Sequence, residues 1–115
     1  LIGIDNSFSM HDEIMEKNIK KSLKNIIESF NDETYFIIKS INNKFELFNG
    51  KKSNYNYNNL KLTYNYKTNN FNDFLSNINK KDYSKFLNKY LFILSDLQYN
   101  NTIIITRSSS AYVVL

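Results

Sequence analysis

The chain of 115 residues has no cysteine, no proline and no tryptophan, and it has only two glycines and one histidine. The absence of cysteine excludes disulfides, thiol catalysis and zinc–thiolate sites. The two glycines, Gly3 and Gly50, are too few for a glycine-rich phosphate loop. A serine hydrolase would need a base, and the one histidine, His11, falls where we expect the exposed start of a helix. No apolar run approaches the roughly 20 residues that a membrane-spanning helix needs.

The net charge of +4 raises the question of nucleic-acid binding. The lysines are spread along the chain, and their pairs at 20–21, 51–52 and 80–81 stand apart. A nucleic-acid surface needs several cations on one face, so that counterions are released together. We therefore expect solvated lysines and no nucleic-acid partner.

The length suits one domain over residues 1–115, with a single core. Leu1 opens a strand-like run without any lead-in, and the last apolar run, 112–115, stops without a turn. We therefore interpret the chain as a piece of a longer protein. We expect no membrane contact within this segment, while an anchor in the flanking sequence would lie outside it.

Hydrophobic periodicity predicts the first half of the fold. An apolar run at 1–4 is typical of a strand buried on both faces. Apolar residues at 19, 23, 26, 27 and 30 form one stripe of a helix over about 11–30, with acidic residues in its first turns. The β-branched and aromatic segment 34–41 predicts a strand, followed by a tight turn and a second strand at 44–48.

The second half is less regular. Residues 49–59 read as a loop turning at Gly50, and alternating tyrosines and leucines between 55 and 66 suggest part of an edge strand. A helix is expected at about 70–79, one or two more helical turns at 83–90, and strands at 91–95, 102–106 and 111–115. The alternation of strands and helices predicts an α/β fold with a central, mostly parallel sheet flanked by helices.

Two of the buried strands end in an aspartate, Asp5 and Asp96. In open α/β sheets ligands bind outside the carboxyl ends of the strands. If the two strands run parallel and adjacent, the two carboxylates become neighbours at that edge.

The residues directly after the first strand are the candidate ligands of a metal ion. Asp5, Ser7 and Ser9 alternate along an extended segment, so their side-chain oxygens can point the same way. One carboxylate and two hydroxyls suit Mg²⁺ or Mn²⁺, which prefer oxygen ligands, and do not suit zinc. Because hydroxyls are weak neutral ligands, the site needs a second carboxylate, and Asp96 is placed to supply it.

The segment 1–10 (LIGIDNSFSM) resembles the first strand and the Asp-x-Ser-x-Ser motif of von Willebrand factor A (VWA) domains. With Ser-Asp-Leu-Gln at 95–98, it is similar to the bacterial versions in BatA-like envelope proteins. The resemblance implies a Rossmann-like VWA fold, here truncated, and a metal-ion-dependent adhesion site (MIDAS). Thr68, ahead of the second helix, and Asp96 match the residues that complete that site, and Thr63 is the alternative threonine.

The same resemblance implies a function. The module would bind an acidic residue of a partner protein through Mg²⁺ or Mn²⁺, without catalysis, and the cell envelope would be its setting. One alternative is a structural VWA-like module without metal, in which Asp5 simply caps the following helix. Another is a fragment of an actin-like ATPase, whose first strand can also read Ile-Gly-Ile-Asp.

Overall fold

The computed structural model describes residues 1–7, 10–43, 45–64, 71–80, 83–95 and 110–114. Strands and helices alternate along the chain, as expected for an α/β protein. The elements are β1 (Ile2–Ile4), α1 (Glu13–Glu28), β2 (Tyr35–Ser40), β3 (Glu46–Lys51), α2 (Phe71–Lys80), β4 (Tyr90–Leu94) and β5 (Ser110–Val114). Two short 3-10 turns, η2 (Lys52–Asn54) and η3 (Tyr57–Asn59), follow β3. None of the helices in the described ranges is long and apolar enough to cross a membrane.

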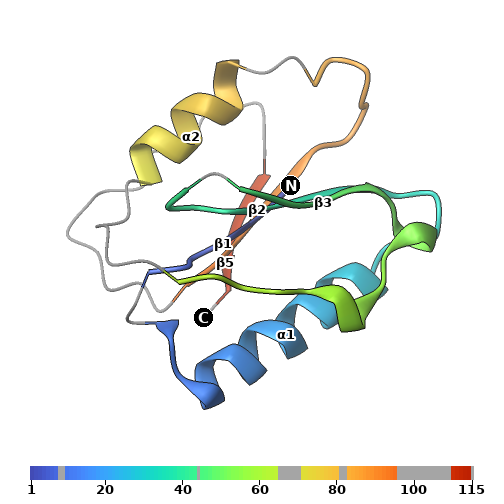
Figure 1. Cartoon of the computed structure of the whole chain (residues 1–115). Coiled ribbons are helices and arrows are strands. Elements are labelled where there is room, and N and C mark those ends of the chain that lie inside the picture. Colours follow the sequence, from blue (N-terminus) through green and yellow to red (C-terminus); the bar gives the residue numbers. More distant parts are fainter. Residues whose placement is uncertain (8–9, 44, 65–70, 81–82, 96–109, 115) are drawn as a thin grey trace.

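The strands form one sheet in the order β3-β2-β1-β4-β5. β1 pairs in parallel with both β2 and β4, and β5 pairs in parallel with β4. β3 alone is antiparallel, paired with β2 across a register shift between Ile38 and Lys39. The two helices lie on opposite faces of the sheet (Figure 1). The prediction of an α/β fold with a mostly parallel central sheet flanked by helices is therefore confirmed.

Helix α1 covers one face because its apolar stripe meets the sheet. Asp12 caps the helix: one carboxylate oxygen accepts hydrogen bonds from the backbone N–H groups of Ile14 and Met15, at 2.9 and 3.1 Å. The helix begins two residues later than predicted, since Asp12 itself is extended. Its buried residues pack with apolar side chains of β1, β2 and β4; they are Ile19, Leu23, Ile26 and Ile27.

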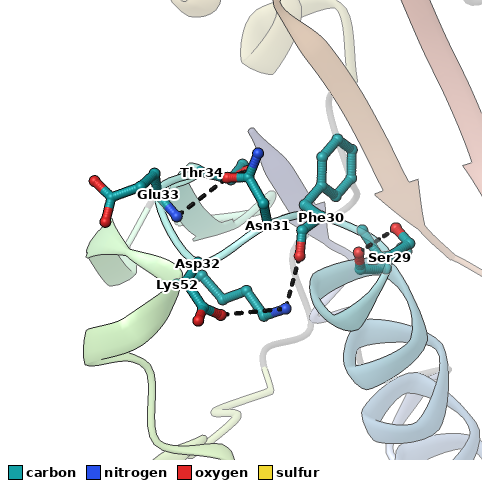
Figure 2. Close-up of polar contacts among 8 residues, drawn as sticks. Ser29, Phe30, Asn31, Asp32, Glu33, Thr34 and Lys52 are labelled. Atoms are coloured by element: carbon teal, nitrogen blue, oxygen red, sulfur yellow. Dashed lines mark hydrogen bonds and ion pairs between the residues drawn. The ribbon is translucent and has the colours of Figure 1, made fainter.

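The loop that leaves α1 is held by a lysine from beyond β3 (Figure 2). The Lys52 ammonium donates to the Phe30 carbonyl at 2.6 Å and lies 3.7 Å from the Asp32 carboxylate. The Phe30 carbonyl lies one residue beyond the C-cap Ser29, and a cation so close to a helix C-terminus also complements the helix dipole. Asn31 tightens the same turn by accepting from the Glu33 backbone N–H at 3.1 Å.

A smaller core lies on the face that α2 covers. There the buried Phe74 of α2 packs with Ile41, Leu91 and Ile93. Gly3 of β1 faces this core, and a Cβ added to it would lie 2.9 Å from two ring carbons of Phe74. The absence of a side chain at Gly3 thus allows α2 to approach the centre of the sheet.

Two predicted elements are wrong. Residues 60–64 form no strand; the segment instead packs partly buried side chains, among them Leu60, Leu62 and Tyr64, against the core on the α1 side. Residues 83–89 form turns and bends instead of helix, and Phe86 places its ring 5.5 Å from that of Tyr35. In residues 60–64 the packing of the apolar side chains outweighs the weak local periodicity, whereas Leu87 of the second segment is fully exposed.

The hairpin that β2 and β3 form is also longer than predicted. β3 runs to Lys51, and Gly50 pairs with Phe36 inside the strand instead of making a turn. The last predicted strand, 111–115, is present as β5 at 110–114. The predicted strand at 102–106 lies outside the described residues.

Candidate functional site

The candidate site lies where the strand order reverses, between β1 and β4. β1 leads to β2 and β3 on one side, and β4 leads to β5 on the other. β1 and β4 are parallel and end together, with Ile4 opposite Leu94. The Asp5 backbone N–H continues the pairing by donating to the Leu94 carbonyl at 2.9 Å. In doubly wound sheets such a reversal is the position of the ligand crevice.

The Asp5 side chain is fully buried at this point. One carboxylate oxygen accepts from the Ser7 backbone N–H at 2.8 Å, and the other accepts from the Ser95 hydroxyl at 2.8 Å. A buried carboxylate is stable only when such donors replace its water, and hydrogen bonds to a charged group contribute about 1.5–3 kcal/mol each. Asp5 is therefore held rigidly between its own strand end and that of β4.

Asp5 does not cap α1, as the metal-free alternative supposed. The capping residue is Asp12, seven positions later in the chain. The carboxylate of Asp5 serves the turn after β1 and the junction with β4, so that explanation for an aspartate at this position is wrong.

The structure brings together part of the predicted constellation. Asp5 and the half-buried Ser7 are in contact through the Ser7 backbone N–H, whereas the predicted alignment of their side-chain oxygens stays a prediction. Ser9, Thr68 and Asp96 lie outside the described residues. The condition for Asp5 and Asp96 to be neighbours, parallel and adjacent strands, is confirmed.

Ser95 is a residue of the site to which sequence reasoning gave no role. It is buried at 3% exposure, and its hydroxyl binds Asp5 across 90 positions of sequence. The signal was present, because Ser95 immediately precedes Asp96 at the end of an apolar strand. A serine has no distinctive pattern of its own, so only the pairing of β1 with β4 reveals its partner.

Asn6 is a second residue that sequence reasoning missed. It is fully buried, and its side-chain carbonyl accepts from the Asn42 backbone N–H at 3.0 Å. Its amide donates to the Thr63 carbonyl at 3.0 Å and, at 3.5 Å, to the Asn43 side chain. The Thr63 side chain is exposed, although its backbone reaches the end of β1. Asparagine is so common in this chain that no single one stood out.

The donor set at this edge consists of oxygen, which fits a hard divalent cation. The described ranges contain no group of three or more His, Cys, Asp or Glu that could hold a metal by itself. A cation bound here would therefore use hydroxyls and the second carboxylate predicted from the sequence.

His11 has the surface position expected of it. It is exposed, and its ring lies 4.8 Å from that of Tyr64, two positions before α1 begins.

Comparison with models of protein families, with curated proteins and with solved structures finds no match to this chain.

Proposed function

We propose that this chain is a metal-dependent adhesion module of the VWA type. Asp5, Ser7 and Ser9 would bind Mg²⁺ or Mn²⁺ directly, and Thr68 and Asp96 would bind it directly or through water. An acidic side chain of a partner protein would take the remaining coordination position. The observation that carries the proposal is the buried Asp5 carboxylate, fixed by Ser95 at the reversal of the strand order.

The sheet topology supports this assignment. The order β3-β2-β1-β4-β5 is the beginning of the doubly wound pattern, in which ligands bind at the carboxyl ends beside the reversal. An antiparallel edge strand such as β3 is common in sheets of this class. The motif therefore occupies the position where a ligand site is expected on physical grounds.

The contacts around Asp5 also suit a cation ligand. Groups that hydrogen-bond to a metal ligand fix its orientation and raise the affinity of the site. The Ser7 N–H and the Ser95 hydroxyl hold one carboxylate oxygen each, so the group is oriented before any cation arrives. Ordering the ligand in advance lowers the entropic cost of binding.

The chemistry of such a site is binding. The cation would supply a positive charge that attracts a carboxylate of the partner, while the protein oxygens hold it at the sheet edge. Ser7 and Ser95 are engaged with Asp5 through hydrogen bonds that orient the carboxylate. We therefore propose recognition of an acidic protein partner and no catalytic step.

A structural module without metal is the second candidate, and the same hydrogen bonds favour it. One oxygen of Asp5 holds the turn after β1 and the other joins the ends of β1 and β4, which is a sufficient structural reason for an aspartate. The ATPase alternative has less support. Gly3 is packed against Phe74 and Gly50 lies within β3, so neither is in a phosphate-binding loop.

Thermal unfolding with and without Mg²⁺ or Mn²⁺ tests the proposal. Saturation at about 100 times Kd stabilises a folded protein by about 2.7 kcal/mol, which for a domain of this size corresponds to a rise in Tm of about 10 °C. In Asp5→Asn, whose amide can still accept from Ser7, this rise should disappear while the domain stays folded. Asp12→Asn, which keeps the cap of α1, is the matched control and should respond like the wild type.

Each result separates the candidates. No rise in Tm for the wild type with either cation would leave the structural module as the better description. A rise produced by ATP alone would point to the ATPase. If the cation response is present, Thr63→Val and Thr68→Val identify the threonine ligand, since only one of the two should reduce it.

A further inference from the structure

The side chain of Asn6 connects three segments that are distant in sequence. It extends from the end of β1, binds the backbone of Asn42 in the loop between β2 and β3, and binds the backbone of Thr63 in the segment after η3. The two backbone contacts measure 3.0 Å, and the contact with the Asn43 side chain is longer at 3.5 Å. All of them come from one buried amide.

Burial makes these contacts specific. A buried amide that lacks a hydrogen-bond partner destabilises the fold, because its desolvation is not compensated. The arrangement that satisfies both its donor and its acceptor is therefore strongly preferred. The side-chain carbonyl takes an N–H group and the side-chain NH₂ takes a carbonyl, which an aliphatic residue of the same size could not do. The amide thus fixes where residue 63 lies relative to the end of β1.

Asn6 is also placed so that it does not compete for the cation. Its neighbours Asp5 and Ser7 belong to the proposed site, whereas the carbonyl and the NH₂ group of the Asn6 side chain are both engaged by the backbone of other segments. Asn6 instead points to the loops. Its effect on a cation would be indirect, through the position of the chain near residue 63.

We infer that Asn6 is a positioning residue that holds the threonine-bearing segment beside the proposed cation site. Thr63 is held directly through its carbonyl. The inference rests on the proposed function for its effect on the cation, whereas the attachment of the segment can be tested separately.

Cleavage by trypsin after Lys61 measures the attachment. Lys61 is exposed in the segment that Asn6 holds, and Lys24, exposed on α1, serves as the internal reference. In Asn6→Ala and Asn6→Asp, the ratio of cleavage after Lys61 to cleavage after Lys24 should rise about tenfold, because a lost hydrogen bond changes a local opening equilibrium by about that factor. Asn6→Asp keeps an acceptor for the Asn42 N–H and loses the donor to Thr63, so the exchange of the Asn42 amide should stay slow.

Ile26→Ala is the control for general loss of stability, since Ile26 is buried in α1 away from these contacts. Loss of stability in α1 or of the whole fold raises cleavage after Lys24 at least as much as after Lys61, so this variant should not raise the cleavage ratio. Titration with Mg²⁺ then tests the positioning role: the apparent Kd of Asn6→Ala should rise about 10- to 100-fold, as for other residues that orient a metal site. Ile26→Ala should bind Mg²⁺ like the wild type.

An unchanged cleavage ratio in both Asn6 variants would overturn the attachment. A raised ratio with an unchanged Kd for Mg²⁺ would overturn the positioning role while leaving the cation site intact. If the wild type binds no Mg²⁺, the proposed function and the effect of Asn6 on the cation fail together, and the cleavage ratio still decides whether Asn6 holds the segment.

Discussion

Replacement of Gly3 by alanine tests how closely α2 packs on the central strand. Gly3 lies in β1, two residues before Asp5, and faces the smaller core. A Cβ at this position would lie 2.9 Å from Cε1 and Cζ of Phe74 and 3.3 Å from Cγ1 of Ile41. Real Cβ atoms essentially never approach other atoms to 2.9 Å, so either the ring or the strand must move.

The expected magnitude follows from two opposing effects. Insertion of a methyl group into a packed core costs about 1–3 kcal/mol. Alanine restricts the unfolded chain more than glycine does, which returns about 0.5–1 kcal/mol. We therefore expect Gly3→Ala to lower the free energy of unfolding by about 1–2 kcal/mol, which corresponds to a decrease in Tm of about 3–10 °C.

A double-mutant cycle with Phe74→Leu isolates the cause. Leucine removes the ring atoms that would meet the new Cβ, so the two substitutions together should cost at least about 0.5 kcal/mol less than the sum of their separate costs. Urea unfolding of the four proteins, followed by far-UV circular dichroism, measures all four free energies. Neutral or stabilising behaviour of Gly3→Ala, or strict additivity with Phe74→Leu, would refute the close approach.

Two further predictions concern the periphery. Lys52→Met should lower the free energy of unfolding by about 1 kcal/mol, because it removes the donor to the Phe30 carbonyl. Lys51→Met, which removes only an exposed ion pair, should change that free energy by less than about 0.5 kcal/mol. Equal effects of the two substitutions in urea unfolding would contradict this prediction. Burial, with a smaller contribution from Tyr57, raises the pKa of Tyr55 from 10.0 to about 12. Burial, with a smaller contribution from Glu16, likewise raises the pKa of Tyr64 from 10.0 to about 12. The unfolded chain releases the phenolic protons of these two tyrosines at lower pH than the folded chain, so their contribution to stability should be fully present below pH 10 and decrease as the pH rises from 10 to 12. Absorbance at the tyrosinate band should show two tyrosines that ionise later than the others. Ionisation of every tyrosine together near pH 10 would contradict this prediction.

The regular elements could be predicted from the sequence where local pattern and tertiary packing agree. The apolar stripe of α1 and the apolar run of β1 are such cases, and both appear with bounds shifted by one or two residues. Residues 60–64 were predicted wrongly because their side chains pack on the rest of the fold, which no local period encodes. In residues 83–89 the Phe86 ring contacts Tyr35 while Leu87 is exposed, so the expected apolar stripe of a helix does not form. The extension of β3 to Lys51 likewise depends on its partner strand.

The candidate site shows the same division. Asp5 and Ser7 could be found because they belong to one short motif at a strand end. Ser95 and Asn6 act through contacts across 90 and 57 positions of sequence, which become visible only when β4 and the loops are in place. All five residues predicted to bind the cation stay predictions, and three of them, Ser9, Thr68 and Asp96, also lie outside the described residues.

The position of β1 at the centre of the sheet has a consequence for biosynthesis. β1 is made before the strands that pair with it, and on one side it is completed by β4, whose adjoining Ser95 meets Asp5 only after 90 further residues exist. At about 5–20 residues per second, the ribosome needs on the order of 5–20 seconds to make them. Throughout that interval the apolar edge of β1 has no native neighbour on the β4 side, and such an edge is prone to pair with other chains. The newly made chain is therefore most exposed to aggregation, and most dependent on chaperones, until the fourth strand has emerged.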